Sequence, residues 1–308
     1  MVVISEVLPI IGMLLLGFFC RKHNYISREG INDIKFLVTK IFLPVAIFNA
    51  LATAEYSGKT IVSILIMLVM LVVSFGLAHL MRPLNKGPYE KYTPYMITVY
   101  EGGMVAYPLF MNLCGSENMF EIAIIDIAGL IFGFGVYMGM LEQMESGEKT
   151  DLISLYKSAL KNPTFDAAVL GVIAGVSGVI KLLLFSDAGV VYQTLESMLT
   201  VAMTPMILIV VGYDLIFEKT TIRQSIKTIV LRMVYQAMLI VLVIWAFRHF
   251  VGENIIRDIA VICYMSSPAT FSLQSFIKRQ ESAKYVATTC SLYCIVSIAV
   301  YIVLSIII

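Results

Sequence analysis

Two carboxylates in this chain stand where a charge is costly. Glu101 lies in the middle of the apolar segment 93–113, and Asp126 lies about one helical turn from the middle of the apolar segment 119–141. A charged side chain at the centre of a bilayer costs about 3 kcal/mol on insertion scales, so it needs a partner or a purpose. A buried carboxyl that takes up and releases a proton can couple transport to protons. We therefore expect Glu101 and Asp126 to belong to a coupling-ion site for H⁺ or, through oxygen ligands, Na⁺.

Basic side chains offer a structural alternative for these two acids. Lys35, Lys40 and Arg232 each lie within or near an apolar segment. An ion pair with one of them would compensate a buried carboxylate without any role in transport. Lys40 lies deeper in its segment than Lys35, and we expect it to be the counter-ion of an acid in the core.

Glycine and proline interrupt two of the apolar segments near their middles. Glu101-Gly102-Gly103 is followed by Pro108 in segment 93–113, and Ser266-Ser267-Pro268-Ala269-Thr270 lies in segment 257–278. Such residues make a continuous helix costly. Hydrocarbon tolerates the freed backbone groups only where protein buries them or water reaches them. We expect the two breaks to meet near the midplane, where half-helix N-termini favour anions and freed carbonyls favour cations.

These breaks define the candidate site. The candidate substrate-binding residues are Glu101, Gly102, Gly103, Tyr107, Pro108, Ser266, Ser267, Pro268 and Thr270, together with Asn49; the candidate coupling-ion residues are Glu101, Asp126 and Gln274. No cofactor, disulfide frame or metal site is expected, because the five cysteines lack CxxC spacing and no HExxH motif occurs.

Proline spacing divides the chain into two similar halves. Pro44 and Pro108 are 64 residues apart, and Pro205 and Pro268 are 63 apart. Each half also opens with a proline eight residues before a glycine, Pro9-x7-Gly17 and Pro163-x7-Gly171. Matched breaks in the two halves are typical of secondary transporters built from inverted repeats.

Composition places the chain in a membrane. It is 59% hydrophobic and 14% charged, with a mean hydropathy of +0.88, and apolar stretches of about 20 residues recur along it. We expect an all-α polytopic fold of two five-helix halves, residues 1–145 and 164–308, joined by a cytoplasmic linker, 146–163, with an amphipathic surface helix over 142–163. The predicted spans are 3–20, 31–54, 60–81, 93–113, 119–141, 164–180, 189–217, 226–249, 257–278 and 284–307.

Basic residues predict the orientation. The odd-numbered loops carry fifteen Lys and Arg residues, whereas the even-numbered loops carry four. The positive-inside rule then places the linker in the cytoplasm and both termini outside the plasma membrane. Five spans per half invert the second half relative to the first. The net charge of +1 does not suggest nucleic-acid binding.

Several motifs resemble the auxin efflux carrier family. They are Pro44 within LPVAIFNAL, KNP at residues 161–163, TPMILIVVGYDL at 204–215 and SSPAT at 266–270. The resemblance implies ten helices in two inverted repeats, with a scaffold of spans one, two, six and seven and broken spans four and nine that cross. It also implies an elevator-type mechanism, homodimers through the scaffold, and small organic anions such as malate, malonate or auxin-like acids as substrates. Bile-acid sodium symporters share this architecture.

One departure bears on the substrate. The family usually has Asn where Glu101 stands here, and an ionised Glu repels a carboxylate. Either Glu101 carries a proton and transport is proton-coupled, or the solute is cationic or zwitterionic and Na⁺ drives it. A ligand sensor, receptor or channel on the same fold is the other alternative. An enzyme is not expected, because the GxGD motif of intramembrane proteases is missing.

Overall fold

The computed structural model describes residues 2–147, 160, 162–215 and 217–308, and these form helices and connecting segments without a strand. Helices occupy all ten ranges predicted as spans. In chain order they are α1 Val2–Lys22; α2 Arg28–Leu37, η1 Val38–Phe42 and α3 Leu43–Ala52; α4 Gly58–Leu80; α5 Thr93–Thr98, η4 Gly102–Ala106 and α6 Tyr107–Cys114; α7 Met119–Phe132, η6 Gly133–Tyr137 and α8 Met138–Ser146; α10 Pro163–Ser177; α12 Asp187–Asp214; α13 Ile222–Phe250; α14 Ile255–Met265 and η7 Phe271–Phe276; and α15 Gln280–Ile307.

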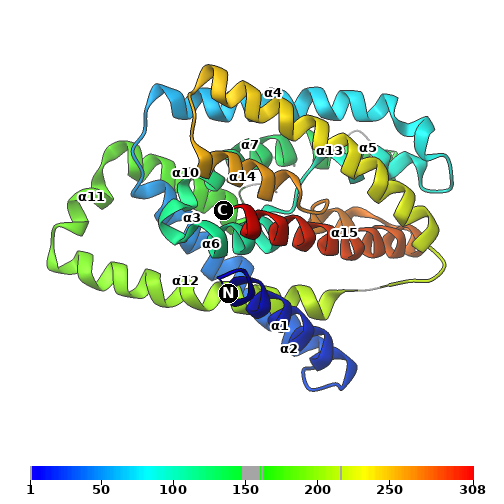
Figure 1. Cartoon of the computed structure of the whole chain (residues 1–308), viewed down its shortest axis with the longest axis horizontal. Coiled ribbons are helices and arrows are strands. Elements are labelled where there is room, and N and C mark those ends of the chain that lie inside the picture. Colours follow the sequence, from blue (N-terminus) through cyan, green and yellow to red (C-terminus); the bar gives the residue numbers. More distant parts are fainter. Residues whose placement is uncertain (1, 148–159, 161, 216) are drawn as a thin grey trace.

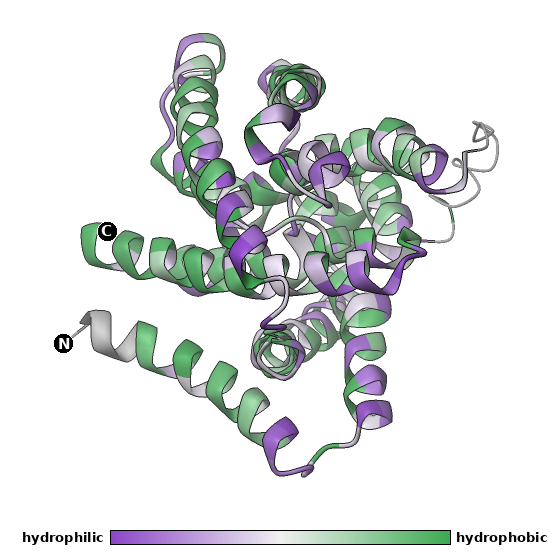
Figure 2. Cartoon of the chain, turned by 90° about the vertical axis from the view of Figure 1, so that its right-hand side faces the viewer, coloured by the Kyte–Doolittle hydropathy of each residue, from purple (hydrophilic) through white to green (hydrophobic). Residues whose placement is uncertain are grey.

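Six helical segments are long and apolar enough to cross a membrane, as expected of a polytopic membrane protein. They are Arg28–Ala52, Gly58–Leu80, Ser116–Ser146, Asp187–Asp214, Ile222–Phe250 and Gln280–Ile307. Apolar residues cover the long helices, and hydrophilic residues gather at helix ends and connections (Figure 2). α8 ends at Ser146, and most of the predicted linker helix, residues 148–159 and 161, lies outside the described part of the chain.

Both predicted breaks interrupt their helices. Val99–Glu101 separates α5 from a π-helical turn, η4, which leads into α6. α14 ends at Met265, and the chain resumes as the 3₁₀ segment η7. Pro108 lies in the first turn of α6, a position at which proline is common. The polar residues of each break are thereby released from helix geometry.

Small residues bring two helix pairs into close contact. α1 packs along α12, where Gly17 faces the backbone of Ile209 and Gly212 faces the backbone of Leu14. α10 packs along α3, where Gly171 lies against Phe48. A Cβ at any of these glycines would meet backbone atoms of the neighbouring helix, so only glycine allows this approach.

The remaining long helices enclose the breaks. α4 packs on α7, and α13 packs on α15 (Figure 1). α14 contacts both α7 and α13, and α6 lies beside α14. The two broken helices are therefore surrounded by continuous ones, which supply the packing that the breaks lose.

Candidate functional site

The two breaks meet at Glu101. Its backbone N–H donates a hydrogen bond of 2.8 Å to the carbonyl of Pro268. Residues 167 positions apart are thus joined directly by their main chains. The two breaks, which we expected to meet, are therefore in contact, and this contact is called the crossover.

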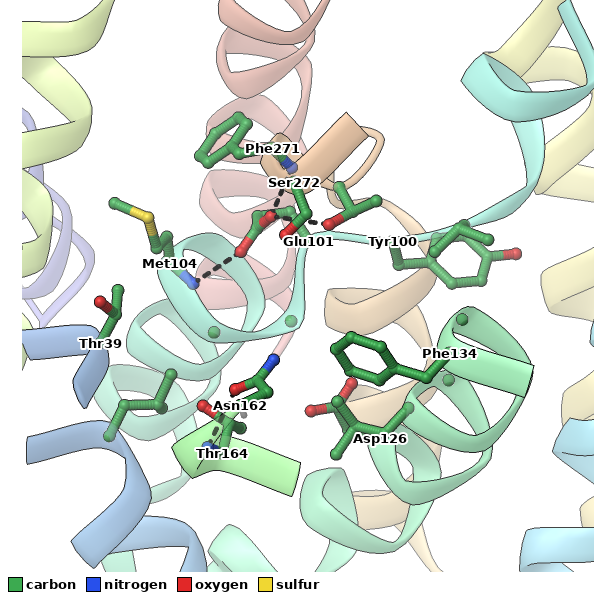
Figure 3. Close-up of a pocket in the computed structure, with 18 of the residues that line it drawn as sticks. Thr39, Tyr100, Glu101, Met104, Asp126, Phe134, Asn162, Thr164, Phe271 and Ser272 are labelled. Carbon is green, nitrogen blue, oxygen red and sulfur yellow. Dashed lines mark hydrogen bonds between the residues drawn. The ribbon is translucent and has the colours of Figure 1, made fainter. Parts of the chain in front are cut away.

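The Glu101 carboxylate binds the start of both following helical segments. Its Oε1 accepts from the N–H of Met104 at 3.2 Å, in the first turn of η4. Its Oε2 accepts from the N–H of Phe271 at 2.7 Å, at the start of η7, and from the Thr270 hydroxyl at 3.4 Å. Figure 3 shows the side chain reaching from its loop to both donors. N-terminal N–H groups lack helical partners and favour negative charge, so this carboxylate caps two segments at once.

Asp126 lies beside the crossover on α7. The Tyr107 hydroxyl donates to its Oδ2 at 3.1 Å, and the Tyr264 hydroxyl is a second hydrogen-bonding partner. A Cβ built on Gly102 would lie 2.9 Å from the Asp126 Oδ1. Gly102 therefore provides the space that this carboxylate occupies, and Tyr107 belongs to the site through its contact with Asp126.

The ion pairs expected for these acids do not form. Among the residues that the structure describes, no Lys or Arg nitrogen lies within 4.0 Å of either carboxylate. Lys35 pairs with Asp214 at 3.1 Å. The expectation that Lys40 is the counter-ion of a core acid is wrong for the described chain, in which it pairs with no carboxylate. Backbone N–H groups and hydroxyls take the place of a cation.

Arg232 has a different partner set. From α13 its guanidinium donates to three main-chain carbonyls, Met96 at 2.6 Å, Val99 at 3.1 Å and Ser267 at 2.7 Å. All three carbonyls belong to the ends of α5 and α14 that lead into the breaks. The structural alternative required Arg232 to be a counter-ion of Glu101 or Asp126, and it is not one.

A cavity of about 330 Å³ lies against the crossover. Its lining residues include the acids Glu101 and Asp126, the hydroxyl-bearing Thr270 and Tyr264, and the basic residues Lys35 and Lys40. Asn162 and Thr164, at the start of α10, lie across the cavity from Glu101 (Figure 3). The volume suits a small polar molecule that meets both signs of charge.

Three π-helical turns border this cavity. Thr39 and Lys40 belong to η1, Gly102 and Gly103 belong to η4, and Phe134 belongs to η6. These are the π turns found in the described residues, and each contributes to the lining. Such turns are frequent at functional sites, and each shifts the side chains that follow it around the helix axis.

Ten of the twelve predicted site residues divide into three groups. Glu101, Gly102, Gly103, Asp126 and Thr270 line the cavity. Tyr107, Pro108 and Pro268 are buried and are not among its lining residues; Tyr107 bonds Asp126, and the Pro268 carbonyl bonds Glu101. Ser266 and Ser267 donate their hydroxyls to carbonyls of α14 and do not line it. Their side chains satisfy the end of their own helix, as Ser often does.

Two predicted residues lie elsewhere. The Asn49 Oδ1 accepts from the Tyr192 hydroxyl at 2.8 Å, which ties α3 to α12 and keeps Asn49 outside the cavity. Gln274 lines a second cavity of about 170 Å³. Met104, Phe271 and Lys35 border both cavities, so the side chains of Met104 and Phe271 form the partition between them.

Sequence reasoning did not assign several residues that the structure brings to the site. Tyr264 bonds Asp126, Thr39 and Phe134 line the cavity, and Met104 and Phe271 act through backbone N–H groups. Tyr264 stands two residues before the SSPAT break at 266–270, which was the one available signal. Backbone donors leave no trace in residue type.

A known protein family matches a range of this chain that includes the whole site. A family model described as membrane transport protein matches residues 2–306. Comparison with curated proteins finds no match. The matched range includes both breaks and every residue that lines the cavity.

Proposed function

The chain belongs to the membrane transport protein family, the family of the auxin efflux carriers, and from this premise we propose that it is a secondary active transporter that moves a small organic anion across the plasma membrane. The family is one of transporters rather than enzymes. Malate, malonate and auxin-like carboxylates are the substrate class proposed. No cofactor is invoked, and the coupling ion proposed is H⁺.

One observation carries the proposal: the Glu101 carboxylate occupies the N–H donors of both half-helices beside the cavity. These donors are the groups that would bind a substrate carboxylate. A proton on Glu101 removes its charge and weakens its hold on Met104 and Phe271. The substrate carboxylate then takes those donors, so that proton and anion bind together.

The proposed architecture is an inverted repeat of residues 1–145 and 164–308 with ten spans. Helix packing supports it, because the repeat exchanges span one with six and span two with seven. The α1–α12 contact joins spans one and seven, and the α10–α3 contact joins spans six and two. Each contact is therefore the equivalent of the other. The same exchange relates the α4–α7 contact to the α13–α15 contact.

We further propose that these two pairs form the scaffold, along which the core carries the crossover in an elevator movement. Exposed apolar residues line the scaffold helices, among them Leu15 on α1, Ile173 on α10 and Met198 on α12. Such a surface suits the bilayer and a homodimer contact through spans one, two, six and seven.

A second candidate is a carrier of a zwitterionic or cationic solute. The observation that favours it is that Glu101 and Asp126 face the cavity without a Lys or Arg partner among the described residues. An ionised pair of acids would bind an amine directly. Na⁺ would then be the alternative coupling ion.

The test is transport by purified protein in liposomes. Organic acids and amino acids are applied at two pH values, with and without Na⁺, and substrate-evoked current is recorded on solid-supported membranes. We expect pH-dependent current for an organic acid, lost in Glu101→Gln and kept in Glu117→Gln, whose parent side chain is exposed outside the cavity. A fully active Glu101→Gln protein would remove Glu101 from the mechanism. Tight binding without flux would favour a receptor.

A further inference from the structure

Arg232 lies among the backbone carbonyls that the breaks leave without helical partners. The last carbonyls of a helix accept no intrahelical bond, and they carry the negative end of the helix dipole. In broken-helix transporters such carbonyls are the ligands of Na⁺. Here the guanidinium occupies carbonyls from both broken helices. We infer that Arg232 is a resident cation that fills the cation position of the crossover, so that transport needs no Na⁺.

The surroundings hold the guanidinium in place. Arg232 is 1% exposed, and its guanidinium lies 5.4 Å from the centre of the Tyr100 ring and 4.9 Å from that of Tyr293. Aromatic faces stabilise a desolvated cation. Gln236, one turn along α13, donates to the carbonyl of Ile97 and accepts from the Tyr100 hydroxyl. Four main-chain carbonyls of the two broken helices are thus bonded by α13 side chains.

The two side chains that bind the half-helix ends at the crossover carry opposite charges. Glu101 binds the N–H groups where η4 and η7 begin, and Arg232 binds the carbonyls where α5 and α14 end. One fixed negative and one fixed positive group therefore complement all four half-helix ends. Arg stays protonated at any physiological pH, whereas Glu101 can gain a proton. Of the two side chains that bind the half-helix ends, only Glu101 can change its charge during a cycle.

The inference rests on the proposed function only in treating the crossover as the transport site. Because Na⁺ binding is measured without a substrate, its test does not depend on finding the transported compound. Four proteins are compared: the wild type, Arg232→Lys, Arg232→Met and Arg257→Met. Arg257 is the control, because it is also a buried arginine that donates to a carbonyl, that of Gly252, and stacks on Phe247 away from the crossover. Thermal unfolding of each protein is recorded in NaCl, KCl and choline chloride of equal ionic strength.

We expect the wild type, Arg257→Met and Arg232→Lys to unfold at the same temperature in all three salts. Arg232→Met should unfold at a lower temperature in choline chloride, because buried carbonyls lose their donors, and NaCl should raise that temperature where KCl does not. A purely structural arginine would give no Na⁺-specific gain. Substrate uptake by Arg232→Met should fall roughly tenfold in choline chloride and recover in part in NaCl.

Three results would overturn the inference. The first is a Na⁺-specific rise in the unfolding temperature of the wild type. The second is an unfolding temperature of Arg232→Met in choline chloride equal to that of the wild type. The third is a destabilised Arg232→Met whose unfolding temperature does not respond to Na⁺. If Arg232→Met does not fold, the wild type and Arg232→Lys decide, and a Na⁺ response of the wild type overturns it. A wild type that ignores Na⁺ and transports no compound would refute the proposed function and leave this inference standing.

Discussion

At the scale of single residues, the site depends on a close approach between a glycine and a carboxylate. Gly102 lies in η4 and faces Asp126 on α7. The approach lets Asp126 reach both the crossover and the Tyr107 hydroxyl. The Gly-Gly pair thus does more than interrupt a helix, because the first glycine leaves room for an acid that lines the cavity.

We predict that Gly102→Ala impairs transport and destabilises the protein by about 1–3 kcal/mol, as overpacking of a filled interior does. The added Cβ would lie 2.9 Å from the Asp126 Oδ1, and one of the two groups must move. Uptake in liposomes and thermal unfolding in detergent measure the two effects.

Gly76→Ala is the matched control. Gly76 is also in a helix, α4, but a Cβ there would have no neighbour within 4 Å. Its substitution should leave uptake and unfolding near the wild-type values. Equal behaviour of the two variants would mean that the contact with Asp126 is unimportant.

At the scale of helices, the two prolines of the second half, Pro205 and Pro268, have different structural effects. Pro205 lies inside the continuous helix α12, whereas Pro268 lies in the break after α14 and its carbonyl accepts from the Glu101 N–H. Helix α12 tolerates its proline, as scaffold helices in membranes can, since neighbouring helices and water satisfy the freed groups. The break at Pro268 instead sets the direction of a backbone carbonyl at the crossover.

We predict that Pro268→Ala impairs transport more than Pro205→Ala. Alanine would restore an N–H and allow α14 to continue toward η7, which would draw the Pro268 carbonyl away from Glu101. Uptake is compared at equal amounts of folded protein, determined by gel filtration. The reverse order of activity would contradict the assignment of the crossover to α14 and η7.

Much of the helix pattern could be predicted from the sequence, since apolar length and proline spacing are local signals. Helices occupy every predicted range, with ends displaced by a few residues, as for α10, which stops at Gly178 with φ +71°. The π turns were not predicted, because they depend on packing. The backbone partners of Glu101 were not predicted for the same reason. Lys35 likewise pairs with Asp214, a residue 179 positions away that the sequence pattern did not indicate.

At the scale of the whole molecule, the cavity lies near segments that carry many basic residues. Lys35 and Asn162 border it, and both lie close in sequence to loops rich in Lys and Arg. We propose, from the positive-inside rule, that these loops face the cytoplasm. The conformation is then the proposed inward-facing one, in which Glu101 exchanges protons and substrate with the cytoplasm.

The last prediction tests this orientation with single cysteines. Glu253 lies in the loop between α13 and α14, and Lys86 lies in the loop that follows α4. We predict that an impermeant maleimide labels Glu253→Cys in intact cells and Lys86→Cys only after permeabilisation. Of the native cysteines, Cys20, Cys263, Cys290 and Cys294 are buried and Cys114 is partly exposed, so the parent protein gives the background.

A third position links orientation to the cavity. Thr39→Cys, on η1, should react only from the cytoplasmic side, because Thr39 lines the cavity together with Lys35, which follows a loop proposed to be cytoplasmic. A transported anion should slow that reaction by occupying the cavity. Labelling of Glu253→Cys from the cytoplasm would reverse the orientation, and the proposed route of the proton to Glu101 would then begin outside the cell.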